Sequence, residues 1–233
     1  MRIIESETIT ETIKELCIKG ACHLPTDVYN RLLEAISTED SPVSKHTLEI
    51  LKENADIAAS NQEPICQDTG MACIFVEIGQ EVYVDGNLTE AINEGVRQGY
   101  TEGYLRKSVV DDPVFDRINT KDNTPAIIHY DIVPGDKLKI TVAPKGFGSE
   151  NMCQVKMLKP SDGIEGVKDF ILKVVEDAGP NPCPPIVIGV GIGGTFDYVT
   201  YLAKKAMIKK IEEHQPDPRY RALEEEMLEK VNA

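Results

Sequence analysis

The sequence predicts an α+β protein in which a helical N-terminal region is followed by a mixed β-sheet flanked by helices. Apolar residues recur every three to four positions through residues 5–60, which is the period of amphipathic helices. After residue 70 they gather in short continuous or alternating runs, which are typical of strands. No repeat, low-complexity stretch or linker separates the two regions. We therefore expect one domain over residues 1–233, helical over 1–62 and built of mixed sheet and helices over 63–233.

The helical region is expected to contain three helices, because Gly20, Pro25 and Pro42 interrupt the apolar pattern. The sheet is expected to begin with two strands, at residues 72–78 and 81–84. Both are rich in β-branched and aromatic residues, which favour the pleated backbone.

The rest of the chain alternates between helical and extended patterns. A helix is expected at 88–107, and two extended runs at 125–133 and 137–143 flank a Pro-Gly-Asp turn, which predicts a hairpin. The remaining expected elements are a glycine-containing loop at 145–151, a helix at 163–178, a buried strand at 185–190, a helix at 195–211 and a charged amphipathic helix at 219–231.

Composition excludes several classes of partner. The chain has 25 Lys and Arg against 39 Asp and Glu, a net charge of −14, which opposes binding to nucleic acid and to anionic membrane surfaces. An anionic substrate would need a local basic site. The N-terminus lacks the apolar core of a secretory signal, and no stretch approaches the ~18 apolar residues of a membrane span. We expect a cytoplasmic protein whose six cysteines are reduced thiols.

Two short motifs point to chemistry that the surrounding pattern does not support. Residues 189–194 fit G-x-G-x-x-G between an expected strand and helix, as in nicotinamide dinucleotide sites. The second strand with its acidic residue, about 20 positions on, is missing. A helix N-terminus behind such a loop still suits an anion. The triplet Asp68-Thr69-Gly70 also occurs in aspartic proteases, but the second triplet that they need is absent.

The cysteines separate by context. Cys17 and Cys22 lie in the helical region and Cys73 in an apolar strand, where a thiol packs as a small hydrophobe. Cys66 and Cys183 lie in loops stiffened by prolines, which suits metal ligands of fixed direction. Taken alone, the two cysteines are better explained as unrelated loop residues, 117 positions apart in the sequence. A structural zinc site usually shows ligand pairs at short spacing, and no C-x₂₋₄-C pair occurs here.

Other candidates have ordinary explanations when each is taken by itself. The loop at 145–151 has the composition of a strand-to-helix connection, with Ser149 or Asn151 as a helix cap. Arg106 ends an expected helix, where a cation is favoured by the helix dipole. His129 in an expected strand is explained by a structural hydrogen bond.

Four motifs in a fixed order, however, resemble one family. They are Cys-Gln-Asp-Thr-Gly at 66–70, Lys-Gly-Phe-Gly-Ser-Glu-Asn at 145–151, Asn-Pro-Cys-Pro-Pro at 181–185 and Gly-Ile-Gly-Gly-Thr-Phe at 191–196. The chain resembles, along nearly its whole length, the alpha subunit of the iron–sulfur hydro-lyases, the group of class I fumarate hydratases and L-tartrate dehydratases. Four ordered motifs are far more specific than any one of them.

The resemblance implies a [4Fe–4S] cluster held by three cysteines, with one iron left open as a Lewis acid for the substrate. Cys66 and Cys183 match two of the ligands. Asp68 matches the catalytic acid/base residue, and Gln67 beside it a catalytic and substrate-contacting residue. Arg106 matches a further substrate contact, which would supply the local positive charge that a dicarboxylate needs.

The resemblance also places Gly148 and Asn151 in a loop that lines the substrate site. Two departures accompany it. The third cluster cysteine of the family lies in a part of the alpha subunit that follows the position of residue 233. Phe147 stands where many members of the family have glycine, so the side of the loop that faces the substrate pocket is expected to be less open.

The family's remaining substrate residues and second acid/base group belong to a beta subunit. The resemblance therefore predicts a chain that is inactive alone and acts in an oligomer with a beta subunit on a small dicarboxylate. The favoured function is the reversible hydration of fumarate to malate. The alternatives are an L-tartrate dehydratase alpha subunit, a non-catalytic metal- or thiol-binding protein, and a truncated remnant that binds no cluster.

Overall fold

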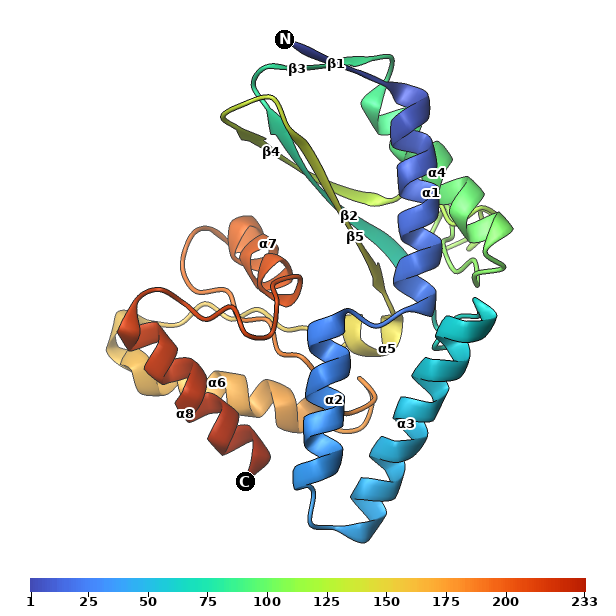
Figure 1. Cartoon of the computed structure of the whole chain (residues 1–233). Coiled ribbons are helices and arrows are strands. Elements are labelled where there is room, and N and C mark those ends of the chain that lie inside the picture. Colours follow the sequence, from blue (N-terminus) through green and yellow to red (C-terminus); the bar gives the residue numbers. More distant parts are fainter. The chain divides into compact units, whose positions relative to one another are not determined.

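The computed structural model describes residues 1–233 and confirms the α+β class, with small sheets flanked by helices (Figure 1). The chain forms two compact units, Met1–Phe147 and Gly148–Ala233. The single domain expected over the whole chain stays a prediction. No helix is both long enough and apolar enough to cross a membrane.

The first unit contains the three helices that the apolar pattern predicts: α1 (Ser6–Cys22), α2 (Thr26–Thr38) and α3 (Pro42–Asn61). Gly20 does not end α1. The helix continues to Cys22, and the backbone N–H of the next residue still donates to the carbonyl of Lys19 at 2.9 Å. Helices α2 and α3 pack against each other as a hairpin (Figure 1).

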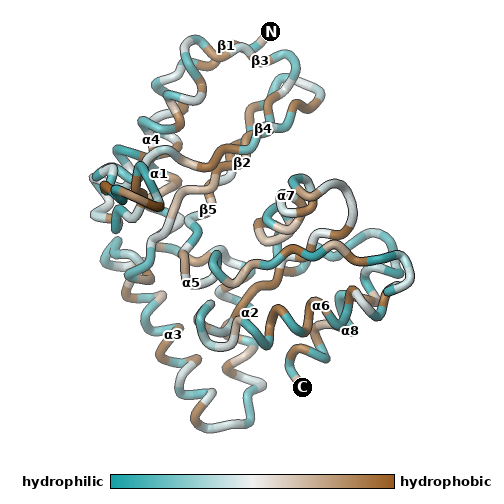
Figure 2. The backbone as a smooth tube through the Cα atoms, turned by 180° about the vertical axis from the view of Figure 1, so that it is seen from behind, coloured by the Kyte–Doolittle hydropathy of each residue, from teal (hydrophilic) through white to brown (hydrophobic).

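The main sheet has the order β4-β2-β5, so the hairpin expected between residues 125 and 143 is wrong. The central strand β2 (Met71–Gly79) pairs parallel with β4 (Ile127–Val133) and antiparallel with β5 (Leu138–Lys145). β2 is the most buried strand and runs as a hydrophobic stretch (Figure 2). Both of its edges need partners, because buried backbone N–H and C=O groups must be paired. It therefore separates the two strands that are neighbours in sequence.

A second, two-stranded sheet was not fully expected. The strand β3 (Val82–Asp85) is close to its expected position, and it pairs parallel with β1 (Arg2–Glu5). The sequence pattern predicts no strand at residues 2–5. A run of four residues carries too little periodicity to be recognised, and pairing across about eighty residues leaves no local signal.

The hydrophobic core lies between the three-stranded sheet and two helices, α1 and α4 (Leu88–Glu102), which run side by side (Figure 1). α4 ends five residues before the expected residue 107. The helices approach closely at Gly95 and Gly99 of α4: a Cβ at Gly95 would lie 2.6 Å from the Cβ of Ile13. The fully buried core residues include Ile9, Ile13 and Cys17 of α1, Ile74 of β2, and Ile92, Val96 and Tyr100 of α4.

The second unit is helical. α6 (Gly163–Ala178) has the predicted bounds, α8 (Pro218–Asn232) confirms the amphipathic C-terminal helix, and α7 (Phe196–Met207) is shorter than expected. α6 packs against α8. Lys168 of α6 is largely buried and forms an ion pair with Glu165 of the same helix and another with Glu226 of α8.

The buried strand expected at residues 185–190 is wrong. The segment forms no strand, residues 148–233 contain no strand at all, and Val187 is 55% exposed. Gly189 and Gly191 lie directly against α7: a Cβ at either would come within 2.3 Å of a helix carbonyl oxygen. The glycine pattern that fits a nucleotide fingerprint therefore serves close packing of backbone against helix.

Candidate active site

The loop before β2 presents Cys66 to solvent on a fixed backbone. The backbone N–H of Ile65 donates to the carbonyl of Ala21 at 2.9 Å, and the side-chain amide of Asn54 donates to the carbonyl of Ile65 at 2.9 Å. The thiol of Cys66 is exposed, and its Sγ accepts the backbone N–H of Asp68 at 3.4 Å. The loop thus presents an exposed thiol whose sulfur is held in place by a backbone hydrogen bond.

Asp68 is held against the end of β5. Its Oδ2 accepts the backbone N–H of Phe147 at 2.8 Å. The following glycine, Gly70, has φ +61°, and a Cβ there would lie 1.9 Å from the carbonyl oxygen of Lys145. Only glycine allows this approach. The Asp-Thr-Gly triplet thus brings the carboxylate of Asp68 against residues 145–147, which are nearly eighty positions away in sequence.

The same loop is tied to the segment that carries Arg106. Thr69 is buried, and its hydroxyl donates to the carbonyl of Arg106 at 3.0 Å. The hydroxyl of Tyr100 on α4 donates to the carbonyl of Thr69 at 3.0 Å. Burial raises the pKa of Tyr100, so the phenol stays a neutral donor. Hydrogen bonds therefore connect the loop of Cys66 and Asp68 to the segment of Arg106 within the first unit. Gln67, between Cys66 and Asp68, is exposed.

Three of the predicted site residues belong to the second unit. Gly148 lies against the loop of Cys183: a Cβ there would lie 2.9 Å from the carbonyl oxygen of Asn181. Cys183 is exposed and has φ +59°, a conformation that costs a non-glycine residue about 1–3 kcal/mol. Asn151 is exposed just after the short helix α5 (Phe147–Glu150).

The structure separates buried thiols from exposed ones. Cys17, Cys22 and Cys73 are buried, and burial raises the pKa of Cys17 to about 12, which keeps it neutral. Cys66 and Cys183 are exposed on loops, so their donor chemistry fits an iron–sulfur group. They belong to different units, and no three metal-ligating side chains gather in the structure.

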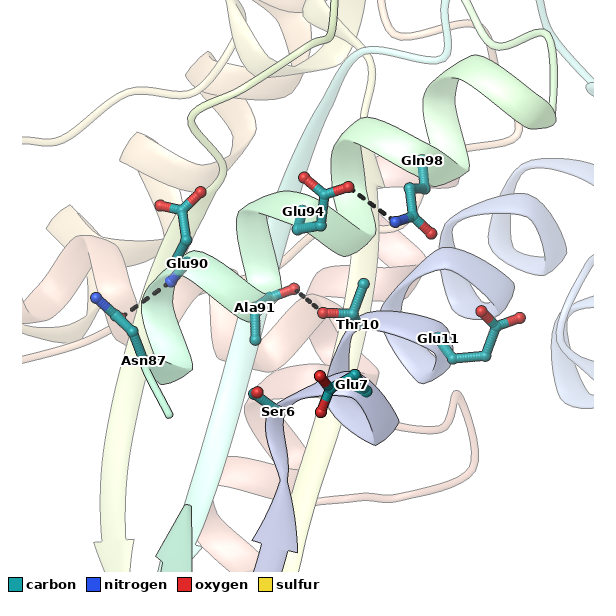
Figure 3. Close-up of a pocket in the computed structure, with 9 residues that line it drawn as sticks. All are labelled: Ser6, Glu7, Thr10, Glu11, Asn87, Glu90, Ala91, Glu94 and Gln98. Carbon is teal, nitrogen blue, oxygen red and sulfur yellow. Dashed lines mark hydrogen bonds between the residues drawn. The ribbon is translucent and has the colours of Figure 1, made fainter. Parts of the chain in front are cut away.

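A hollow of about 460 Å³ between α1 and α4 contains none of the predicted site residues (Figure 3). Glu7, Glu11, Glu90 and Glu94 line it. Four carboxylates repel an anionic substrate, so this hollow does not suit a dicarboxylate. The loops described above are the better candidate.

Sequence reasoning missed the partners that hold the site. The backbone N–H of Phe147 has no sequence signal as a donor. Tyr100 continues the apolar face of α4, which indicates burial, but the pattern does not reveal that its hydroxyl reaches Thr69.

Comparison with known proteins agrees with these motifs. A family model described as fumarate hydratase (Fumerase) matches residues 10–233. The "Putative L(+)-tartrate dehydratase subunit alpha" of Methanocaldococcus jannaschii is 44% identical over 230 residues, which cover 97% of this chain and 81% of the relative. The L(+)-tartrate dehydratase subunit alpha of Escherichia coli strain UTI89 is 30% identical over 96% of this chain and 75% of its own length.

Proposed function

Since this chain belongs to the fumarate hydratase (Fumerase) family of iron–sulfur hydro-lyase alpha subunits, we propose that it is the alpha subunit of an enzyme that interconverts fumarate and malate. The observation that carries the proposal is the carboxylate of Asp68, fixed by the N–H of Phe147 two residues from the exposed thiol of Cys66. An acid/base group and a metal ligand are thereby held on one short loop.

Asp68 is assigned the proton transfer. Hydration of fumarate adds a hydroxyl to one carbon of the double bond and a proton to the other, and the reverse reaction removes both. Asp68 gives or takes one proton, and the N–H of Phe147 fixes the direction of its carboxylate. Cys66 and Cys183 would hold a [4Fe–4S] cluster, which supplies, when bound, a Lewis acid for the departing hydroxyl.

The substrate carboxylates are assigned to Gln67, Arg106, Gly148 and Asn151. The net charge of −14 opposes an anionic substrate, so a local guanidinium is needed, and Arg106 on its exposed segment provides one. The side-chain amides of Gln67 and Asn151 and the backbone at Gly148 add neutral hydrogen-bonding groups.

A beta subunit is the proposed partner. The relatives are named alpha subunits of their enzymes. We assign to the partner the remaining substrate contacts and the second acid/base group, so the alpha chain alone is inactive and the enzyme is a hetero-oligomer.

L(+)-tartrate dehydration is the second candidate, because the relatives carry that name. Tartrate differs from malate by one hydroxyl in place of a hydrogen on the carbon that loses the proton. The same acid/base group and Lewis acid serve both substrates, and the pocket around that hydroxyl decides between them.

The first experiment measures iron and acid-labile sulfide per chain after anaerobic reconstitution with the beta subunit. Cys66→Ser and Cys183→Ser are expected to lose the cluster, whereas Cys153→Ser, which removes an exposed thiol outside the matched motifs, keeps it. Equal iron and sulfide in all three variants and the wild type would overturn the assignment of the two ligands.

The second experiment compares kcat/KM for fumarate, malate and L-tartrate. Asp68→Asn is expected to lower kcat by about 10²–10⁴-fold on every substrate accepted. Asp136→Asn, which changes an exposed carboxylate in the turn after β4, is the matched control. A higher kcat/KM for L-tartrate than for malate would replace the fumarate assignment by the second candidate. An assembled enzyme that dehydrates neither malate nor L-tartrate would refute the proposed function.

A further inference from the structure

A fully buried asparagine lies behind the candidate active-site loop. Asn123 is 0% exposed. Its Oδ1 accepts the backbone N–H groups of Ser108 at 2.7 Å and of Val109 at 3.2 Å, and its Nδ2 donates to the carbonyl of Gly70 at 3.0 Å. One side chain thereby joins two loop segments that do not pair with each other in a sheet or belong to one helix.

The two joined segments lead to two proposed site residues. Gly70 follows Asp68 by two positions, and Ser108 follows Arg106 by two positions. The amide group is the side chain that suits both ends, because it presents an acceptor on one atom and a donor on the other. Gly70 and Val109 are buried and Ser108 is half-buried, so a replacement that lacks either function leaves a backbone group without its hydrogen bond.

The turn that carries Asn123 is itself fixed. Asn123 has φ +63°, in the left-handed region that asparagine tolerates better than most residues. Asp122 beside it accepts the backbone N–H of Thr124 at 3.0 Å, its hydroxyl at 2.8 Å and the Nε of Arg97 on α4 at 3.0 Å. Asn123 is therefore anchored to α4 and acts as a rigid spacer.

We propose that Asn123 is a positioning residue of the active site, which sets the spacing of the two backbone segments that carry Asp68 and Arg106. The proposal rests on the proposed function. A misplacement of about 1 Å between a catalytic group and the substrate costs about 10²-fold in rate. Asn123 touches neither substrate nor cofactor and acts through the two loops that it joins.

Asn123→Asp is the sharpest variant, because the ionised carboxylate keeps the acceptor toward the N–H groups of Ser108 and Val109 and has no donor for the carbonyl of Gly70. In the assembled enzyme we expect kcat to fall about 10²-fold while KM changes less than about threefold. Iron and sulfide content and the circular dichroism spectrum are expected to match the wild type.

Asn119→Asp is the matched control. Asn119 is exposed in the same loop, and its side chain donates to the carbonyl of Lys107 at 2.9 Å. We expect its kcat to stay within about twofold of the wild type. Equal kcat values for Asn123→Asp and Asn119→Asp would overturn the positioning role.

Amide hydrogen exchange gives a readout that needs no activity. In Asn123→Asp, exchange is expected to speed up at residues 67–71 and to stay slow at 108 and 109, because only the donor is lost. Should that variant not fold, the side-chain amide protons of wild-type Asn123 supply the test, since they are expected to exchange far more slowly than those of Asn119. Equal exchange at the two asparagines would refute the inference. An inactive wild-type enzyme with the expected exchange pattern would refute only the proposed function.

Discussion

Replacing Gly95 by alanine places a methyl group where α1 and α4 come closest. The new Cβ would lie 2.6 Å from the Cβ of Ile13 and 2.6 Å from the carbonyl oxygen of Thr10. Non-bonded carbon atoms settle at about 3.5–4 Å, so the helices must separate by a large part of an ångström. That movement also strains the hydrogen bond from the hydroxyl of Thr10 to the carbonyl of Ala91, 3.0 Å long (Figure 3).

The expected change in the free energy of unfolding is the sum of an overpacking cost and a gain in helix propensity. Overpacking a core costs about 1–3 kcal/mol, and the upper end applies because one obstructing atom belongs to the backbone of α1. Alanine is better than glycine inside a helix by about 1 kcal/mol. Gly95→Ala is therefore expected to lower the free energy of unfolding by about 2 kcal/mol.

Gly20→Ala is the matched control, because the nearest atoms to its new Cβ belong to Pro144 at 3.4 Å, an ordinary contact. This variant is expected to gain up to about 1 kcal/mol from helix propensity alone. Equilibrium urea unfolding followed by far-UV circular dichroism measures both. A Gly95→Ala midpoint equal to or above that of Gly20→Ala would refute the close approach of α1 and α4.

Three further predictions concern single groups. Burial would raise the pKa of Asp122, but hydrogen bonds from its neighbours outweigh this and lower it from 3.8 to about 2. The contribution of ionised Asp122 to the free energy of unfolding is therefore complete above pH 3.8 and lost as the pH falls through about 2. Asp122→Asn should remove about 1–2 kcal/mol of this acid-sensitive stability, measured by urea unfolding between about pH 5 and about pH 2. Asn87→Ala should lower stability by about 1 kcal/mol in the same assay, because its Oδ1 caps α4 by accepting the N–H of Glu90 at 3.1 Å. Alkylation at about pH 8 should label Cys66 quickly and Cys17 only on unfolding, and equal rates would contradict the burial of Cys17.

The helices and the chemical motifs were accessible from the sequence. The apolar period located α1, α2 and α3, and it gave the bounds of α6 to the residue. The order of four motifs identified the family before any comparison, and the family match confirms it. The exposure of Cys66 and Cys183 also agrees with their proline-flanked loops, since proline disfavours regular structure and keeps such segments at the surface.

The strand pairings were not accessible in the same way. The turn at residues 134–136 predicted a hairpin, yet β2 lies between the two strands that this turn connects. The apolar run at 185–190 has the composition of a strand, but the second unit offers no strand to pair with. In both cases a local pattern determines the extended backbone, whereas its neighbours depend on segments far along the chain.

The sequence by itself determined the helices, the fold class and the residue types of the candidate site, because these depend on groups within a few positions of one another. The tertiary structure decided which strands pair, which thiols are buried, and that Asn123 connects the segments of Asp68 and Arg106. The hydrogen bonds of Asn123 span 53 positions to Gly70 and 15 to Ser108, and no periodicity or spacing encodes such contacts. They form only when burial leaves each polar group dependent on the partner that the fold brings to it.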